Sequence, residues 1–147
     1  MAVHRDHEAY HELCAYTLTH GDSKFIHQHV VDAFAAQNAN QDTKPIALTF
    51  ALVGLFLRVE KGFSGREVQR AHQYLARAKR VWPSFPLPHS RGSMTALDVM
   101  GYEAGIDRDR AIYEWCAGVW EAFCIADEQT VATVRSMCQG LPRFGPA

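Results

Sequence analysis

The chain lacks the sequence features that would place it in several large functional classes. It has no run of basic residues, and its formal net charge is -1, so the electrostatic footprint of a nucleic-acid-binding protein is missing. Its most apolar segment, residues 45–57, is too short for a membrane span, which needs about 20 residues. The N-terminal ten residues lack the apolar core of a signal peptide. We therefore expect a soluble, cytoplasmic protein that binds neither nucleic acid nor membrane.

Motifs for common site chemistries are also missing from the sequence. The four cysteines, Cys14, Cys116, Cys124 and Cys138, include no Cys-x-x-Cys pair of the kind found in zinc ribbons and redox sites. We expect them to be buried, reduced thiols. No Gly-x-Ser-x-Gly turn occurs, so nothing indicates a serine hydrolase.

What the sequence does contain is helical periodicity along most of its 147 residues. Apolar residues recur at helical spacing, with little strand alternation, and this pattern predicts an all-α fold. We expect one domain, residues 1–147, built as a bundle of about five to six helices, with 141–147 as a frayed tail. The main helices are predicted at about 6–19, 24–38, 45–61, 64–80, 108–126 and 128–139, with a short one from about 95 to 103.

Residues 46–57 are apolar almost all round, so we expect the helix that contains them to be the central one. Ser64 and Glu67 have the spacing of a capping box at the start of the fourth helix, and Asp107 is the expected cap of the helix from about 108.

The segment between the fourth and fifth main elements, residues 81–94, is a different kind of sequence. Its three prolines exclude a helix or a central strand. It also contains Trp82, Phe85 and Leu87, apolar residues that a disordered linker would lack. We expect a long, ordered loop held on the bundle by these side chains, and loops of this length are often functional.

Residues 25–37 place polar side chains on a predicted helix whose other residues are mainly apolar. At about 100° per residue, His27 and Gln37 fall at the edges of the apolar face, while His29 and Asp32 point away from it. A buried polar group without a partner costs about 1–3 kcal/mol, so His27 should have one. His27, Asp32 and Gln37 are candidate ligand-binding residues, although a structural role for Asp32 is the simpler interpretation.

His27 is also a candidate metal ligand together with His72. His72 lies beside Val68 and Leu75 on its predicted helix, so both imidazoles would face the interior. Neutral imidazole is the commonest protein ligand for divalent transition metals. The two rings could meet and share a metal ion if their helices are neighbours, but a buried site needs more ligands than two. A histidine with a hydrogen-bond partner in the core is the competing interpretation.

A second cluster of candidate binding residues follows the proline-rich segment. Arg91 and Gly92 precede a helix start at Thr95, where Asp98 has the spacing of a capping box. Such a segment can bind an anion through backbone N–H groups. Asp98 in the first turn would repel an anion, so a cap with an ion pair between Arg91 and Asp98 is the favoured interpretation.

Several segments together resemble a known family. They are YHELCAYTL, FIHQHVVDAFAAQ, WPSFPLP, RGSMTALDV and VWEAF, and they span about residues 10 to 123. This combination is similar to a bacterial family of small helical proteins of unknown function. The matching positions are His27, Asp32, Phe34, Gln37, the pairs Trp82-Pro83 and Arg91-Gly92, and Asp98. The resemblance implies a shared helical fold and no activity.

Two functional hypotheses follow from these observations. The first is a binding or scaffold module in which the loop 81–94 and the neighbouring helices meet a small molecule or a protein. The second is a metal-dependent enzyme with a buried site containing His27 and His72. The sequence does not decide whether the protein is an enzyme. A homodimer is a further expectation, because symmetric dimers are the commonest assembly.

Overall fold

The computed structural model describes residues 2–19, 24–78 and 81–142. They form seven α-helices, and none of the described residues is in a strand, which confirms the predicted all-α class. The helices are α1 (Ala2–Thr19), α2 (His27–Gln37), α3 (Pro45–Lys61), α4 (Gly65–Ala76), α5 (Ala96–Met100), α6 (Ile106–Ala126) and α7 (Glu128–Gln139). The helix predicted to reach residue 80 ends at Ala76, and the expected tail from 141 lies mostly outside the described residues.

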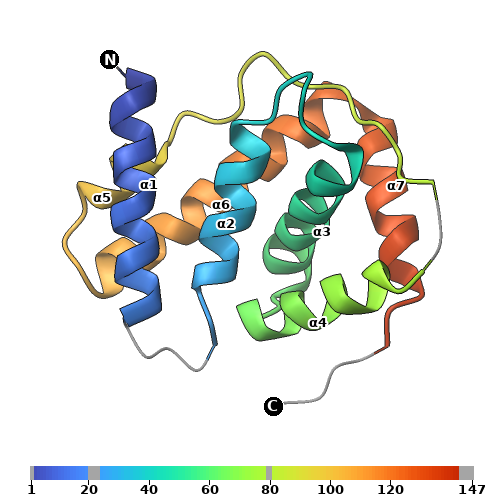
Figure 1. Ribbon diagram of the computed structural model, residues 1–147, viewed down its shortest axis with the longest axis horizontal. Helices are drawn as coiled ribbons and strands as arrows, with labels where there is room; N and C mark the ends of the chain where they lie inside the picture. The colour runs from blue at the N-terminus through green and yellow to red at the C-terminus, as the bar shows by residue number, and fades with distance from the viewer. Residues whose placement is uncertain (1, 20–23, 79–80, 143–147) are drawn as a thin grey trace.

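Helices α2 and α3 form the centre of the bundle. Helix α3 packs against α2, α4, α6 and α7, and every residue from Ala51 to Leu57 is buried. This confirms the expectation of a central helix that is apolar almost all round. Helix α2 packs against α1, α3, α4 and α6, so it also has neighbours on several sides. Figure 1 shows the two helices side by side, with α1 and α7 at opposite ends of the molecule.

Local signals in the sequence set several helix boundaries. Ser64 and Glu67 form the capping box at the start of α4, and Pro45 occupies the first position of α3. Gly62 ends α3 in the left-handed conformation, with φ of 70°. Helix α6 differs from the prediction, because it begins at Ile106 and has Gly105, not Asp107, at its N-cap.

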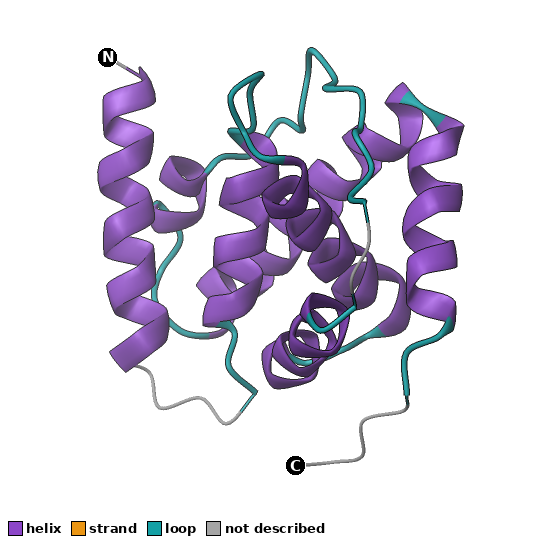
Figure 2. Ribbon diagram, turned by 45° about the vertical axis from the view of Figure 1, so that its right-hand side comes forward, coloured by secondary structure: helices purple, strands orange, loops and turns teal. Residues whose placement is uncertain are grey.

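The proline-rich segment, 81–94, runs over one end of the bundle, as Figure 1 and Figure 2 both show. It contains neither helix nor strand, as predicted. Phe85 is only 9% exposed, and Trp82 and Leu87 pack partly against the core. The segment is therefore a loop packed against the core, in rough agreement with the prediction. None of the described helices is long and apolar enough to cross a membrane.

Candidate functional site

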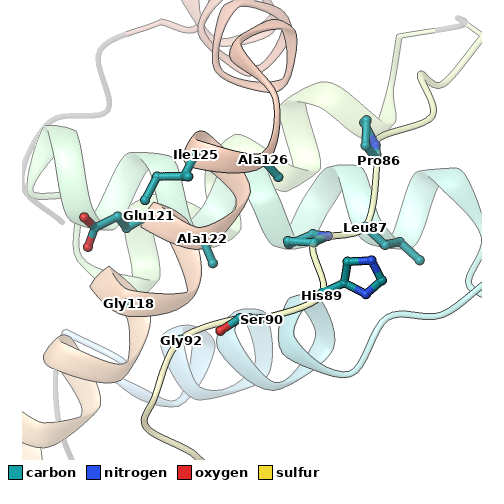
Figure 3. A pocket seen from close by; sticks show the side chains of 11 residues that line it. Pro86, Leu87, His89, Ser90, Gly92, Gly118, Glu121, Ala122, Ile125 and Ala126 are labelled. Carbon is teal, nitrogen blue, oxygen red and sulfur yellow. The ribbon is translucent and has the colours of Figure 1, made fainter.

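A groove lies between the proline-rich segment and the second half of α6. This groove has a volume of about 690 Å³. Figure 3 shows Glu121, Ala122 and Ile125 projecting from α6 and Leu87 and His89 projecting from the loop. The full lining is Pro86, Leu87, Pro88, His89, Ser90, Gly92, Gly118, Glu121, Ala122, Ile125 and Ala126.

A close backbone contact brings the loop onto α6 beside the groove. Gly92 has a φ of +93°, a conformation that glycine adopts at little cost. A Cβ atom added to Gly92 would lie 3.1 Å from the carbonyl carbon of Gly118 and 3.3 Å from its oxygen. Because Gly92 has no side chain, its backbone lies close to that of Gly118.

Gln37, at the end of α2, joins the loop to the core. Its Nε2 donates to the carbonyl oxygens of Arg91, at 3.2 Å, and Met94, at 2.7 Å. Its Oε1 accepts a hydrogen bond of 3.0 Å from the indole Nε1 of the buried Trp115 on α6. One amide group therefore connects α2, α6 and the loop. Gln37 was predicted as a ligand-binding residue, and here it positions the loop.

Arg91 fixes the same loop to the C-terminus of α2. Its Nη1 donates to the carbonyl oxygens of Ala36, Gln37 and Ala39, and its Nε donates to Pro88 at 3.1 Å. Ala36 and Gln37 belong to the last turn of α2, whose carbonyl groups lack the usual intrahelical donors, so the guanidinium acts as a cap there. The Ala36 oxygen also accepts a hydrogen bond of 3.4 Å from the backbone N–H of Ala39, which lies just beyond the helix. Partial burial lowers the pKa of Arg91 from its usual value.

The structure confirms one part of the expectation for Asp98 and contradicts the other. Asp98 Oδ2 accepts a hydrogen bond of 2.9 Å from the backbone N–H of Thr95, and together they form the predicted capping box of α5. The expected ion pair with Arg91 is absent from the described contacts, because Arg91 is directed at carbonyl groups of α2 and the loop. Asp98 lines a shallow surface depression with Met94 and Leu97, separate from the groove.

His27 and His72 each have a hydrogen-bond partner of their own. His27 Nδ1 lies 3.0 Å from Thr17 Oγ1 on α1, and burial lowers its pKa. His72 Nε2 donates to the carbonyl oxygen of Phe50 at 2.8 Å, its ring stacks on that of Phe50, and burial lowers its pKa as well. Among the described residues no three His, Cys, Asp or Glu side chains are grouped to hold a metal ion. A metal site at His27 and His72 stays a prediction.

The prediction that His29 and Asp32 point away from the core is wrong. Both side chains are only 3% exposed. The periodicity of α2 identified one apolar face correctly, with Val30 and Ala33 fully buried, but the side that carries Asp32 is covered too, because the backbone of α3 at Gly54 lies against its carboxyl group. Desolvation by burial raises the pKa of Asp32 well above its usual value, although a hydrogen bond from Gln28 acts in the opposite direction.

The thiols of the described chain are all free, and Cys116 is buried as expected while the other three are partly buried. Burial raises the pKa of Cys116 and Cys138 to about 12 and that of Cys124 to about 11. A thiol with such a pKa is protonated near neutral pH and is a poor nucleophile.

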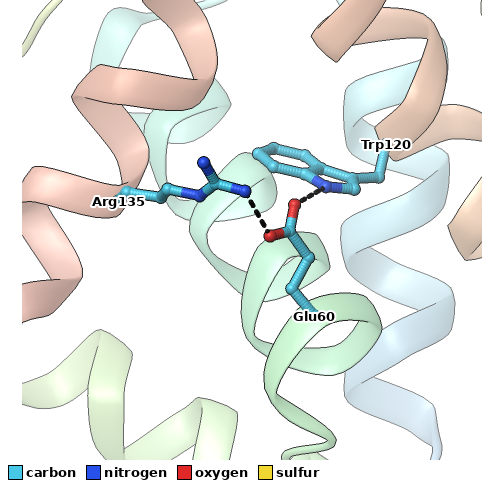
Figure 4. A network of polar contacts seen from close by, with 3 residues as sticks. All are labelled: Glu60, Trp120 and Arg135. Carbon is cyan, nitrogen blue, oxygen red and sulfur yellow. Dashed lines mark hydrogen bonds and ion pairs between the residues drawn. The ribbon is translucent and has the colours of Figure 1, made fainter.

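A polar network joins the three helices α3, α6 and α7. Glu60 on α3 accepts a hydrogen bond of 2.7 Å from Trp120 Nε1 on α6 and one of 2.9 Å from Arg135 on α7, as Figure 4 shows. Burial alone would raise the pKa of Glu60, but the two hydrogen bonds and the positive charge of Arg135 outweigh it and lower the pKa. The network is structural and contains no group directed at the groove lining.

Sequence reasoning identified the loop side of the groove and missed the α6 side. The residues missed are Glu121, Ala122 and Ile125, which lie next to the buried positions Val119 and Phe123. Ile125 is 77% exposed. The one available signal was an isoleucine that lies outside the buried face of its helix. Single exposed apolar residues are too common for this signal to be decisive.

Comparison with known proteins places the chain in a family without adding an activity. Neither the curated proteins nor the solved structures gave a match to this chain. A family model does match, over residues 5–124, which include the helices α2 to α5, the proline-rich segment and almost all of α6. The chain belongs to a family of unknown function, DUF5946.

Proposed function

We propose that the protein is a binding module and that the groove between residues 86–92 and α6 holds a small, mainly apolar molecule. The observation that carries this proposal is a groove of about 690 Å³ with an apolar lining beside a fixed loop. Sites for small molecules have volumes of about 300–1,000 Å³ and are lined mostly by apolar groups with a few polar ones.

The anchoring of the loop supports a preformed site. Gln37 and Arg91 together make hydrogen bonds to six carbonyl oxygens on α2 and the loop, and Trp115 holds the Gln37 amide in place. Gly92 rests on the backbone of Gly118. A ligand would therefore enter a groove whose walls are already in position, which lowers the entropic cost of binding.

The lining indicates the chemistry of the ligand. Ile125 is 77% exposed beside Ala122, and covering an isoleucine side chain fully is worth about 1.5–3 kcal/mol. Glu121 on α6 and His89 on the loop are lining residues with polar side chains. An aromatic or aliphatic body with one hydrogen-bonding group matches this lining.

The proposal is tested by titrating small probes into the wild type and into a variant whose groove is filled by a tryptophan side chain. Amide chemical shifts of the ¹⁵N-labelled protein are followed during titration with small aromatic probes such as indole and naphthol. We expect shifts at Gly92, Gly118 and their neighbours, and we expect Ala122→Trp to remove them by occupying the space. Ala132→Trp on the exposed face of α7 is the matched control and should bind the probes as the wild type does.

Either of two results would reject the proposal. One is that no probe shifts the groove amides at millimolar concentration. The other is that Ala122→Trp binds the probes as well as Ala132→Trp does, which would move the site elsewhere. Shifts caused by a protein partner alone, without any small probe, would favour the scaffold interpretation instead.

A further inference from the structure

The most unusual polar group in the molecule is the carboxyl group of Asp32, in the middle of the central helix α2. We propose that the folded protein holds Asp32 as a neutral carboxylic acid at neutral pH. We also propose that the stability of the contact between α2 and α3 depends on this protonation. Ionisation of the carboxyl group would loosen the contact between the two helices.

The hydrogen bonding of Asp32 is incomplete. Oδ1 accepts a hydrogen bond of 3.1 Å from Gln28 Nε2, one turn earlier on the same helix. Oδ2 is fully buried and has no hydrogen-bond partner among the described residues. A buried carboxylate normally needs several donors or a cation to offset the loss of hydration. A neutral carboxylic acid needs far fewer such partners, because it loses much less hydration free energy on burial.

The backbone of α3 lies directly against this unpartnered oxygen. A Cβ atom added to Gly54 would be 1.9 Å from Asp32 Oδ2 and 2.5 Å from its Cγ. The carboxyl group thus occupies the space that a side chain at position 54 would fill. Water cannot approach the oxygen from this side, so the helix contact itself prevents hydration of a charge.

Within the part of the chain that the structure describes, burial and the hydrogen bond from Gln28 act on Asp32, and no positive charge is among the influences on it. Tyr10 on α1 and Cys116 on α6 are close enough for the charge of Asp32 to affect them, and burial chiefly raises the pKa of each to about 12, so both are neutral. The buried residues of α4 are Gly65, Val68, Ala71 and Leu75, which are apolar. On α3, the charge of Arg58 acts to lower the pKa of Cys116 against the effect of burial. The Arg58 guanidinium donates a hydrogen bond to the carbonyl oxygen of Phe63.

Buried His29 precedes Asp32 by three residues on α2, and its backbone oxygen accepts from Cys116 at 3.5 Å. No described ion pair involves Asp32. Burial therefore dominates, and it raises the pKa of Asp32.

The sign of the pH dependence follows from linkage. An acid whose pKa is higher in the folded state than in the unfolded state stabilises the fold fully below the unfolded value, near 4. That contribution is lost as the pH rises toward and through the folded pKa. Asp32 should therefore lower the stability of the protein as the pH rises above about 5, where ordinary surface carboxylates are already ionised.

Urea unfolding from pH 5 to pH 9 tests the proposal on the wild type, Asp32→Asn and Asp42→Asn. The titration of Asp32 should raise the unfolding equilibrium constant with pH, by at most about tenfold per pH unit, the limit for one proton. His27 and His72, whose folded-state pKa values are lowered by burial, act in the opposite direction below about pH 6.5 in all three proteins. The test is therefore the ratio of the unfolding constants of the wild type and Asp32→Asn, which keeps the shape and the hydrogen bond from Gln28 but cannot ionise; this ratio should rise with pH. Asp42→Asn alters an exposed aspartate and should follow the wild type.

Infrared spectroscopy of protein with ¹³C-labelled aspartate provides a second measurement that needs no variant to fold. A protonated carboxyl band at pH 7 that is sensitive to the label supports the proposal, because exposed aspartates are ionised there. The absence of that band, or the same pH dependence of unfolding in Asp32→Asn as in the wild type, overturns it.

Discussion

Two polar side chains of α2, Asp32 and Gln37, differ in how far the surrounding protein satisfies their hydrogen-bonding groups. Gln37 makes three hydrogen bonds, to Arg91, Met94 and Trp115, and its amide uses both its donor and its acceptor atoms. Asp32 has one hydrogen bond, and its second oxygen is pressed against Gly54. Five residues along one helix thus separate a satisfied polar group from an unsatisfied one.

The difference shows what each kind of buried polar group can do. A satisfied group such as Gln37 fixes the position of its neighbours, here the loop that forms one wall of the groove. An unsatisfied group such as Asp32 stores unfavourable desolvation energy, so its effect on stability depends on its protonation state. The first defines a geometry, and the second makes the fold sensitive to pH.

The largest expected effect is that of Gly54→Ala, which places a methyl group where the Asp32 carboxyl lies. Overpacking of this kind costs about 1–3 kcal/mol, and we expect the upper end because both helices are central. Urea unfolding measures the loss. Gly118→Ala is the matched control, since its added Cβ would be 4.0 Å from the nearest atom, Gly92 Cα, and should be tolerated.

A double-mutant cycle isolates the contact. Gly54→Ala should be far less destabilising when Asp32 is also alanine, with a coupling energy of about 0.5–3 kcal/mol. Additive effects of the two substitutions would show that the carboxyl group and the α3 backbone do not compete for the same space.

A smaller effect is expected for Gln37→Leu, which leaves the Trp115 indole N–H and two loop carbonyls without their partner. A lost partner in a partly buried site costs about 1–3 kcal/mol, and we expect about 2 kcal/mol in unfolding. Hydrogen exchange of amides in 88–94 should accelerate. Gln73→Leu, on the exposed face of α4, should change neither quantity.

The smallest effect is expected for Arg135→Ala, which breaks the ion pair with Glu60. The Arg135 side chain is 56% exposed, so solvent screens the pair and the unfolding midpoint should hardly move. Any difference in the unfolding midpoint between Arg135→Ala and the wild type should vanish at high salt concentration. Trp120→Phe, which removes a donor from a residue that is only 3% exposed, should have the larger effect of the two. The reverse order would mean that the ion pair dominates this network.

Local patterns predicted much of the fold. The central position of residues 45–57, the capping boxes at Ser64 and Thr95, and the ordered proline-rich loop all follow from spacing, and all are observed. These features depend on neighbours within one or two turns of the chain. They are the features that a sequence without an alignment can reveal.

The candidate site was harder to predict. Gln37 and Arg91 were identified as important, but their partners lie more than fifty residues away in the chain, so their task of holding the loop was not foreseen. Asp32 was placed on an outer face because a helical pattern divides residues into two faces. The helical pattern carries no information on how many neighbouring helices will cover each face.

The amino-acid sequence by itself determined the helical class, several helix ends, the apolar central helix α3 and the position of the long loop, because these depend on periodicity and on local hydrogen bonding. Only the tertiary structure decided that Asp32 lies in the space left by Gly54 and that the loop meets α6 at Gly118 to form a groove. Both outcomes require backbones distant in the chain to approach closely, and such contacts depend on how all the helices pack at once.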